Sequence, residues 1–229
     1  QLSYVGTARA LRDVMLLSET SGRVVSLNFE VGQNVRAGQV LLVVDAEVRR
    51  AALASAQAAA EQARRDVARY EALRRQNTGT EVELERLRLQ LAGAEAQLTQ
   101  ARRMLADTRV TAPISGTVAS RSVDMGSTLA PGSPIANIVD ISRLKVVVNV
   151  PEQDVFKLRP GSRVQVSASV HPGARFAGVV TAVSPKADES HTYPVEVTIA
   201  NSGQTPLKAG MFARVSLTDK GGRALTIPR

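Results

Sequence analysis

The side chains best suited to metal or acid–base chemistry gather in one short stretch of the C-terminal third. The chain has only two histidines, and a metal site could draw on four residues of this stretch: His171, Asp188, Glu189 and His191. Their spacing lacks the register of a ligand set, and the Gly and Pro residues around them are typical of turns. We therefore expect ordinary turns here and no metal centre.

Other catalytic chemistry finds no support in the sequence. There is no cysteine, which excludes disulfides, thiolate zinc sites, iron–sulfur ligation and cysteine nucleophiles. Phosphate-binding Gly loops, dinucleotide fingerprints and the HExxH and GxSxG motifs are also absent. We predict that the protein is not an enzyme and holds no cofactor. We interpret the scattered methionines as gap-filling core residues rather than a soft-metal relay: Met15, Met104, Met125 and Met211.

Size and composition favour thin modules joined end to end. The 229 residues allow one or two domains, and aromatic residues are only 3% with no Trp. The net charge of +8 is concentrated in the last third, but basic residues are interleaved with acidic ones. Because stacking aromatics are also scarce, we expect no nucleic acid binding. No apolar run approaches the ~20 residues of a membrane span, and we expect a mature or trimmed chain because it starts at Gln1 without Met.

A glycine-punctuated repeat recurs at an offset of 94 residues. It pairs three glycines and three apolar positions: Gly22 with Gly116, Gly32 with Gly126, Gly38 with Gly132, Val24 with Val118, Val35 with Leu129 and Leu41 with Ile135. Glycines at fixed offsets between short apolar runs are typical of tight turns that join short strands. Neither half has enough apolar residues for a core of its own, so we predict that the two halves pack face to face as one sandwich.

The segment between the two halves has a helical composition. Residues 46–108 contain no Pro and are rich in Ala, Glu, Gln, Arg and Leu. Apolar residues spaced alternately by three and four predict a coiled-coil seam on two helices: Leu53, Ala56, Ala60, Ala63, Val67 and Tyr70, then Leu84, Leu87, Leu91, Ala94, Leu98, Ala101 and Leu105. We expect the helices to be separated at Asn77–Gly79, with Asp45 as the first N-cap and a capping box at Thr80–Glu83.

The last third has the alternating pattern of a small antiparallel barrel. Predicted strands are Leu144–Val150, Arg163–Val170, Arg175–Val183, Tyr193–Ile199 and Phe212–Leu217, with a short helix at Pro151–Leu158. The chain ends, Leu2–Leu17 and Leu225–Pro228, are also strand-like. They could pair with each other or close the barrel.

Together these segments resemble the periplasmic adaptor, or membrane fusion, proteins of tripartite efflux pumps, the HlyD-like family with RND-type members. The resemblance is carried by Ser21–Leu41 with Asp45, by Ala112–Val118, by Val150–Glu152 and by Ala209–Val215. It implies a mainly β, elongated multidomain fold with an α-helical coiled-coil hairpin, a lipoyl-like sandwich and a small antiparallel β-barrel.

The resemblance also implies five regions along the chain. They are an N-terminal strand for the barrel or membrane-proximal region (1–17), a sandwich (18–45 with 109–140), the hairpin (46–108), the barrel (141–219) and the start of a membrane-proximal region (220–229). We expect flexibility at the links Arg9–Ser18 and Asp140–Leu144.

A carrier of biotin or lipoyl groups is excluded despite the sandwich. Such carriers need a lysine at the hairpin joining the two halves, yet all five lysines follow residue 144: Lys145, Lys157, Lys186, Lys208 and Lys220. The helical insert occupies the place of the modified lysine.

The function implied by the resemblance is that of an adaptor. It would link an inner-membrane transporter, RND-type in the first instance, to a TolC-like outer-membrane channel. It would lie in the periplasm, contact the inner membrane peripherally and self-associate as three or six copies. Two alternatives stay open: an adaptor of an ABC-type exporter, and a structural coiled-coil protein unrelated to transport.

In this family the hairpin tip docks on the channel through an Arg, Leu and Ser pattern. Arg69, Leu73 and Thr80 have the matching spacing, with Thr in place of Ser. Each also has a local interpretation: a solvated helix face for Arg69, packing within the hairpin for Leu73 and a helix cap for Thr80. The cap and the docking contact are compatible in one residue.

Overall fold

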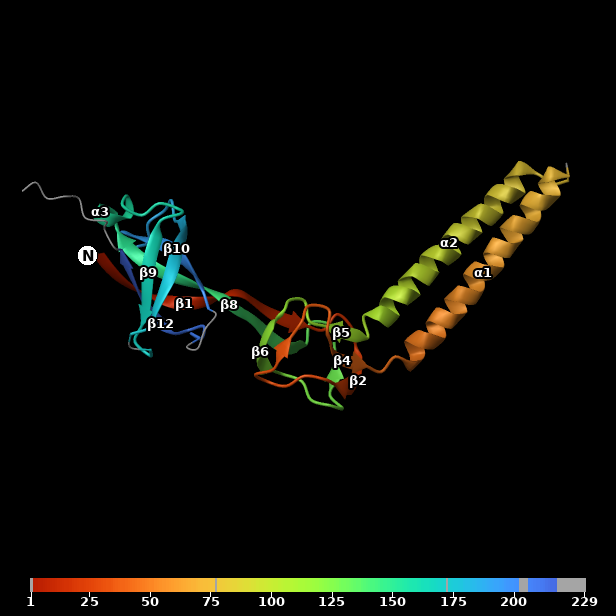
Figure 1. Cartoon of the computed structure of the whole chain (residues 1–229). Coiled ribbons are helices and arrows are strands. Elements are labelled where there is room, and N and C mark those ends of the chain that lie inside the picture. The colour runs from red at the N-terminus through yellow and green to blue at the C-terminus, as the bar shows by residue number, and fades with distance from the viewer. Residues whose placement is uncertain (1, 77, 172, 202–205, 218–229) are drawn as a thin grey trace, which may run out of the picture. The chain divides into compact units, whose positions relative to one another are not determined.

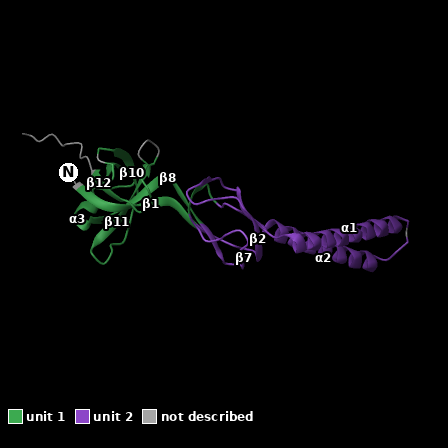
Figure 2. Cartoon of the chain, turned by 90° about the horizontal axis from the view of Figure 1, so that it is seen from below, with its two compact units in different colours: residues 1–14, 114–119, 137–229 green, residues 15–113, 120–136 purple. Residues whose placement is uncertain are grey.

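A computed structural model describes residues 2–76, 78–171, 173–201 and 206–217 of the chain. Backbone contacts divide the chain into two compact units, residues 1–14, 114–119 and 137–229 in one and residues 15–113 and 120–136 in the other (Figure 2). The predicted fold class is confirmed: the chain is mainly β with one long helical hairpin (Figure 1). The predicted strand at 225–228 and the region 220–229 lie outside the described residues, as does Asn77.

The first unit is built around a closed barrel of six antiparallel strands. Around the barrel the order is β1 (Leu2–Leu17), β12 (Phe212–Leu217), β9 (Arg163–Ala168), β10 (Arg175–Val183), β11 (Thr192–Ala200) and β8 (Pro134–Pro151), and β8 pairs with β1 to close it. The predicted strands of the last third are all present. β6 (Gly116–Arg121) follows β8 in the same sheet.

The barrel core follows from strict alternation along its strands. On β8 the side chains of Leu144, Val146, Val148 and Val150 are at most 1% exposed. On β11 the same alternation buries Val195, Val197 and Ile199, while the residues between them lie outward. The fully buried side chains of the core are all aliphatic, and the aromatic side chains of Tyr4, Phe176 and Tyr193 pack against it while only partly buried.

The N-terminal strand completes the barrel. β1 pairs antiparallel with β12 from Leu2 opposite Leu217 to Thr7 opposite Phe212. Tyr4 on β1 donates a hydrogen bond to the Asp154 carboxylate at 2.8 Å, and burial, followed by this bond, raises the pKa of Tyr4 to about 12. Asp154 lies on α3 (Glu152–Val155), which is shorter than the predicted helix: Pro151 ends β8 and serves as the N-cap, and the helix ends at Val155 with Phe156 as the C-cap.

The second unit contains a four-stranded sheet in the order β5 (Arg109–Thr111), β4 (Val40–Val44), β2 (Gly22–Leu27) and β7 (Thr128–Leu129). The short strand β3 (Asn34–Val35) belongs to the same unit. β2 comes from the first repeat and β7 from the second, with Gly22 opposite Leu129 and Arg23 opposite Thr128. The two halves of the repeat are therefore joined strand to strand through β2 and β7, a contact that the predicted face-to-face packing did not include.

Hydrogen bonds reproduce the repeat with its two halves exchanged. The Gly38 amide donates to Ala112 O at 2.9 Å, and the Gly132 amide donates to Ser18 O at 2.8 Å. The return bonds, Ala112 N to Gln39 O and Ser18 N to Ser133 O, are both 2.9 Å long. Gly38 and Gly132 are 94 positions apart, and so are Ser18 and Ala112. The glycine turn of each half is therefore hydrogen-bonded to the other half.

Two of the three matched glycine pairs of the repeat share their backbone conformation, and the matched apolar positions share their burial. Gly32 and Gly126 have φ of 87° and 86°, and Gly38 and Gly132 have φ of 81° and 85°, values that favour glycine. All six matched apolar side chains are at most 5% exposed. Gly116 differs from the predicted turn glycine, because it lies in β6 where a Cβ would approach Val139 O to 2.5 Å.

The hairpin consists of α1 (Glu47–Arg75) and α2 (Glu81–Ala106), which run side by side in both views (Figures 1 and 2). Every residue of the predicted seam is buried or half-buried, which confirms the coiled-coil interface. The N-cap of α1 is Ala46 rather than Asp45, although the Asp45 carboxylate still accepts the Glu47 N–H at 3.0 Å. Asp45 therefore performs the capping chemistry from one position earlier.

Two other predictions need revision or stay open. Met15, Met104 and Met125 are 48–71% exposed, so only Met211, which packs on the barrel, fits the predicted core role. The links Arg9–Ser18 and Asp140–Leu144 coincide largely with uninterrupted strand in β1 and β8. Their flexibility and the boundaries of the five regions stay predictions.

Candidate functional site at the hairpin tip

The histidine-containing stretch forms turns. The Asp188 carboxylate accepts hydrogen bonds from Ser190 N, Thr192 N and the Thr192 hydroxyl at 2.7–2.9 Å, and the bond from this hydroxyl is the main cause of its lowered pKa. Within the described ranges no three His, Cys, Asp or Glu side chains are placed to hold a metal ion. Asp188 thus has a structural role in the turn before β11.

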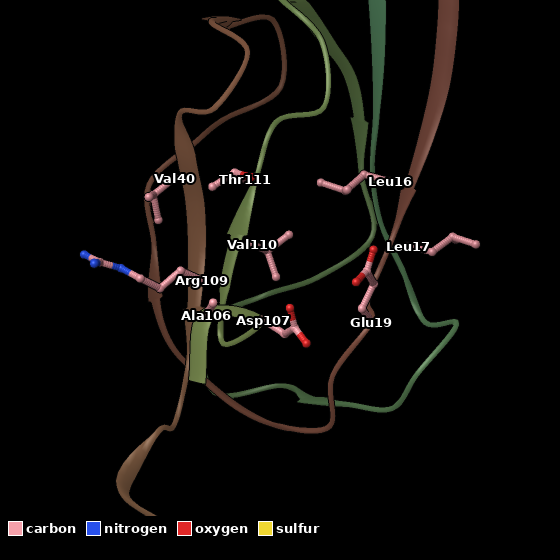
Figure 3. Close-up of a pocket in the computed structure, with 9 residues that line it drawn as sticks. All are labelled: Leu16, Leu17, Glu19, Val40, Ala106, Asp107, Arg109, Val110 and Thr111. Atoms are coloured by element: carbon pink, nitrogen blue, oxygen red, sulfur yellow. The ribbon is translucent and has the colours of Figure 1, made fainter. Parts of the chain in front are cut away.

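The pocket in Figure 3 lies within the second unit and has a volume of about 520 Å³. Leu16, Leu17, Val40 and Val110 line it together with two carboxylates, Asp107 and Glu19, while the Arg109 side chain points away. Its lining offers no pairing of a nucleophile with a base, so the pocket gives no reason to revise the prediction that the protein is not an enzyme.

The hairpin begins and ends on neighbouring strands of the sheet. Asp45 and Ala46 connect β4 to α1, and Asp107 and Thr108 connect α2 to β5. The strands β4 and β5 pair with each other. Arg49 fixes the start of α1: its Nη2 donates to Ser21 O at 2.6 Å and to Thr20 Oγ1 at 3.0 Å, and its Nη1 donates to Asp45 O at 3.3 Å. One side chain therefore ties the first turn of the helix to the residues preceding β2.

Replacing Arg49 should loosen the base of the hairpin. We expect Arg49→Ala to destabilise the second unit by about 1.5–3 kcal/mol, because charge-assisted hydrogen bonds are lost and the buried Thr20 loses a partner. Spin labels on α1 and on β2 should then give a broader distance distribution. Arg50→Ala is the matched control, since Arg50 is exposed and adjacent. Equal distributions in both variants would show that Arg49 does not hold the helix.

The structure brings the three predicted tip residues to the closed end of the hairpin. Arg69 and Leu73 lie in the last two turns of α1, and Thr80 is the N-cap of α2. The Arg69 side chain is 68% exposed and Leu73 is 41% exposed. Packing within the hairpin therefore accounts for only the buried part of the Leu73 side chain, and the rest of that side chain faces solvent.

Arg69 differs from the arginines that join the two helices. Interhelical ion pairs connect Arg64 with Glu95, Arg88 with Glu71 and Arg74 with Glu81. Among the residues that the structure describes, Arg69 instead pairs only within α1, with Asp66 at 3.5 Å. Because exposed pairs contribute little and this one is long, the Arg69 guanidinium can exchange it for an external acceptor at low cost.

Thr80 caps α2, but the predicted capping box is only half formed. Thr80 Oγ1 accepts the Glu83 N–H at 3.4 Å. Glu83 does not return the bond; its carboxylate is held by Arg86 at 2.5 and 2.9 Å, which lowers the pKa of Glu83. The Thr80 N–H instead donates to the Tyr70 hydroxyl at 2.8 Å.

Sequence reasoning placed Tyr70 in the seam and missed its contact with the turn. Tyr70 ends the apolar pattern of the first helix, ten residues before Thr80, and this position gave no indication of a partner for its hydroxyl. Arg49 was missed too, because arginine in the first turn of a helix is usually solvated. In both cases the hydrogen-bond partner belongs to a segment whose placement depends on the fold.

Two family descriptions match the chain in tandem. "RND MFP, barrel-sandwich hybrid domain" matches residues 12–141, more than half of the chain, and "CusB-like, beta-barrel domain" matches residues 144–221. The boundary between them falls within β8.

Curated relatives agree with these matches. The multidrug resistance protein MdtA of Salmonella typhimurium is 33% identical over 171 residues, covering 67% of this chain and 41% of that protein. An uncharacterized protein of Haemophilus influenzae is 26% identical over 217 residues, covering 94% of this chain and 57% of that protein. The chain thus spans about half the length of these relatives.

Solved structures share the fold. A MacA–MexA chimera that contains the Pseudomonas aeruginosa MexA α-hairpin aligns with a TM-score of 0.82 at 23% identity, covering 93% of this chain and 79% of that one. A putative efflux transporter from Bacteroides eggerthii aligns with a TM-score of 0.80 at 22% identity, covering 93% and 67%.

No helix in the described part of the chain is long and apolar enough to cross a membrane. The barrel, the paired repeat with a hairpin between its halves, and the two tandem family matches give one consistent assignment. The chain belongs to the RND-type membrane fusion proteins, the adaptor family of efflux systems.

Proposed function

We propose that this chain is the periplasmic adaptor subunit of a tripartite efflux pump, linking an inner-membrane RND-type transporter to a TolC-like outer-membrane channel. The observation that carries the proposal is the closed end of the hairpin, where Arg69, Leu73 and Thr80 are exposed together. Membrane fusion proteins are adaptors and not enzymes, which confirms the prediction that the chain has no catalytic activity of its own.

The geometry of the hairpin supports docking at a distance. A helix of 29 residues spans about 40 Å, and a paired coiled coil resists bending over that length. One hairpin cannot enclose a conduit, so we include self-association of three or six copies in the proposal. Contact with the inner membrane is peripheral in this scheme.

An RND-type partner is favoured over an ABC-type exporter. Support comes from the sandwich match, whose description names RND membrane fusion proteins, and from the barrel match, which belongs to the same class. Affinity purification from solubilised inner membranes tests the choice. Recovery of a transporter with about a dozen membrane helices supports the proposal, whereas recovery of a subunit with nucleotide-binding motifs contradicts it.

The tip can be tested by a double substitution, Arg69→Asp with Leu73→Ser. The change reverses the charge and removes the exposed apolar side chain, while the seam residues stay in place. We expect loss of efflux in a complemented null strain and loss of cross-linking between the tip and the channel. The helical circular dichroism signal should be unchanged.

A matched control carries the same types of change far from the tip. Arg102→Asp with Met104→Ser alters two exposed positions near the base of α2. This variant should retain efflux and cross-linking. If the tip variant behaved like this control, the docking proposal would be withdrawn.

A further inference from the structure

The hairpin turn is held by a side chain that belongs to neither the family pattern nor the predicted capping box. Tyr70 lies on α1, and its hydroxyl accepts the Thr80 N–H at 2.8 Å and donates to Thr80 O at 3.4 Å. One phenol thus engages both backbone polar groups of Thr80, the residue that caps α2. The helices are linked across the turn by this residue in addition to the seam.

Gly79 and the Tyr70 ring fit each other. Gly79 has a φ of +120°, and a Cβ at this position would lie 2.8 Å from the Tyr70 hydroxyl oxygen and 2.9 Å from Cζ. Only glycine combines this backbone conformation with the space that the ring needs. The turn therefore has its observed path because the ring packs against it.

This arrangement leaves the Thr80 hydroxyl able to donate a hydrogen bond to a partner protein. The Thr80 N–H is satisfied by Tyr70, so Glu83 is not needed for the box and pairs with Arg86. The Thr80 hydroxyl accepts from Glu83 N, and its own proton has no acceptor among the described residues. It is exposed and can donate to a carbonyl or carboxylate of a partner.

We propose that Tyr70 is the positioning residue of the docking tip, holding Thr80 in the orientation in which its hydroxyl meets the channel. This inference rests on the proposed function. Holding a turn in its bound conformation reduces the entropy that binding must otherwise overcome. Tyr70 acts through Thr80 and makes no contact with the channel itself.

The test uses Tyr70→Phe, which keeps the ring against Gly79 and removes only the hydroxyl. We expect the Thr80 amide to exchange with solvent about tenfold faster in the isolated chain, because it loses its acceptor. Affinity for a purified TolC-like channel in detergent should fall by up to about tenfold. The thermal midpoint of the helical signal should stay the same, which a purely structural role would not predict. Tyr193→Phe, a hydroxyl deletion in the barrel, is the control and should change none of these.

A double-mutant cycle separates positioning from stability. In a Thr80→Ala background, Tyr70→Phe should cause no further loss of affinity, because there is no hydroxyl left to orient. Additive losses would overturn the inference, as would a Thr80 amide as protected in Tyr70→Phe as in the original chain. The Arg69→Asp, Leu73→Ser variant is measured in parallel. If it binds normally, the proposed function itself fails; if it loses binding while Tyr70→Phe binds normally, only the positioning role is rejected.

Discussion

Gly6→Ala should open the barrel, with an expected loss of about 3 kcal/mol in the free energy of unfolding of the first unit. The Cβ of alanine would lie 2.0 Å from Val147 O and 2.6 Å from Val148 Cγ1. Most overpacked sites relax by moving a side chain, but here the obstacle is the backbone carbonyl of β8. Because β1 and β8 make the pairing that closes the barrel, relief of the clash separates those two strands.

Hydrogen exchange followed by mass spectrometry measures this effect region by region. Amides of β8 and β11 should exchange roughly 100-fold faster in Gly6→Ala, since 1.4 kcal/mol corresponds to a factor of ten. Peptides from α1 and α2 should be unchanged, because the hairpin lies in the other unit. Gly93→Ala is the matched control: Gly93 lies within α2, and a Cβ added there would meet open space, so alanine should be neutral or stabilising by up to about 1 kcal/mol. A barrel in Gly6→Ala as protected as in the control would show that β1 does not need a glycine there.

Gly6 illustrates the limit of sequence reasoning for this chain. The repeat glycines were recognised because their spacing recurs, and the structure gives four of them nearly identical φ values. Gly6 has no counterpart at the repeat offset and no turn around it. Its role depends on β1 crossing close to β8, a contact between residues about 140 positions apart that no local pattern records.

The same distinction applies to the candidate site. The seam, the turn and the cap at Thr80 follow from local spacing and were predictable. The exposed fraction of Leu73 was not predictable, because its position in the sequence fits a side chain packed within the hairpin as well as one that faces solvent. The Tyr70 contact was hidden for a different reason: the capping box already offered a sufficient partner for the Thr80 amide.

The strongest test of the hairpin is the comparison of two leucines on the same helix. Leu98 lies in the seam and is 3% exposed, whereas Leu89 lies on the outer face and is 70% exposed. Leu98→Ala should destabilise the hairpin by about 2–5 kcal/mol, through lost burial and the cavity left behind. The cost should lie in the upper part of this range, because α1 contributes the small side chains Ala60 and Ala63 to the seam and has little with which to fill a void.

Leu89→Ala removes the same atoms from an exposed position and should change stability by less than about 0.5 kcal/mol. Thermal unfolding followed at 222 nm reports mainly on α1 and α2, because α3 has only four residues. A large fall in the midpoint for Leu98→Ala with none for Leu89→Ala is the expected pair of results. Equal shifts would mean that the two helices are not joined through the observed seam, and the reach assigned to the docking tip would then lose its physical basis.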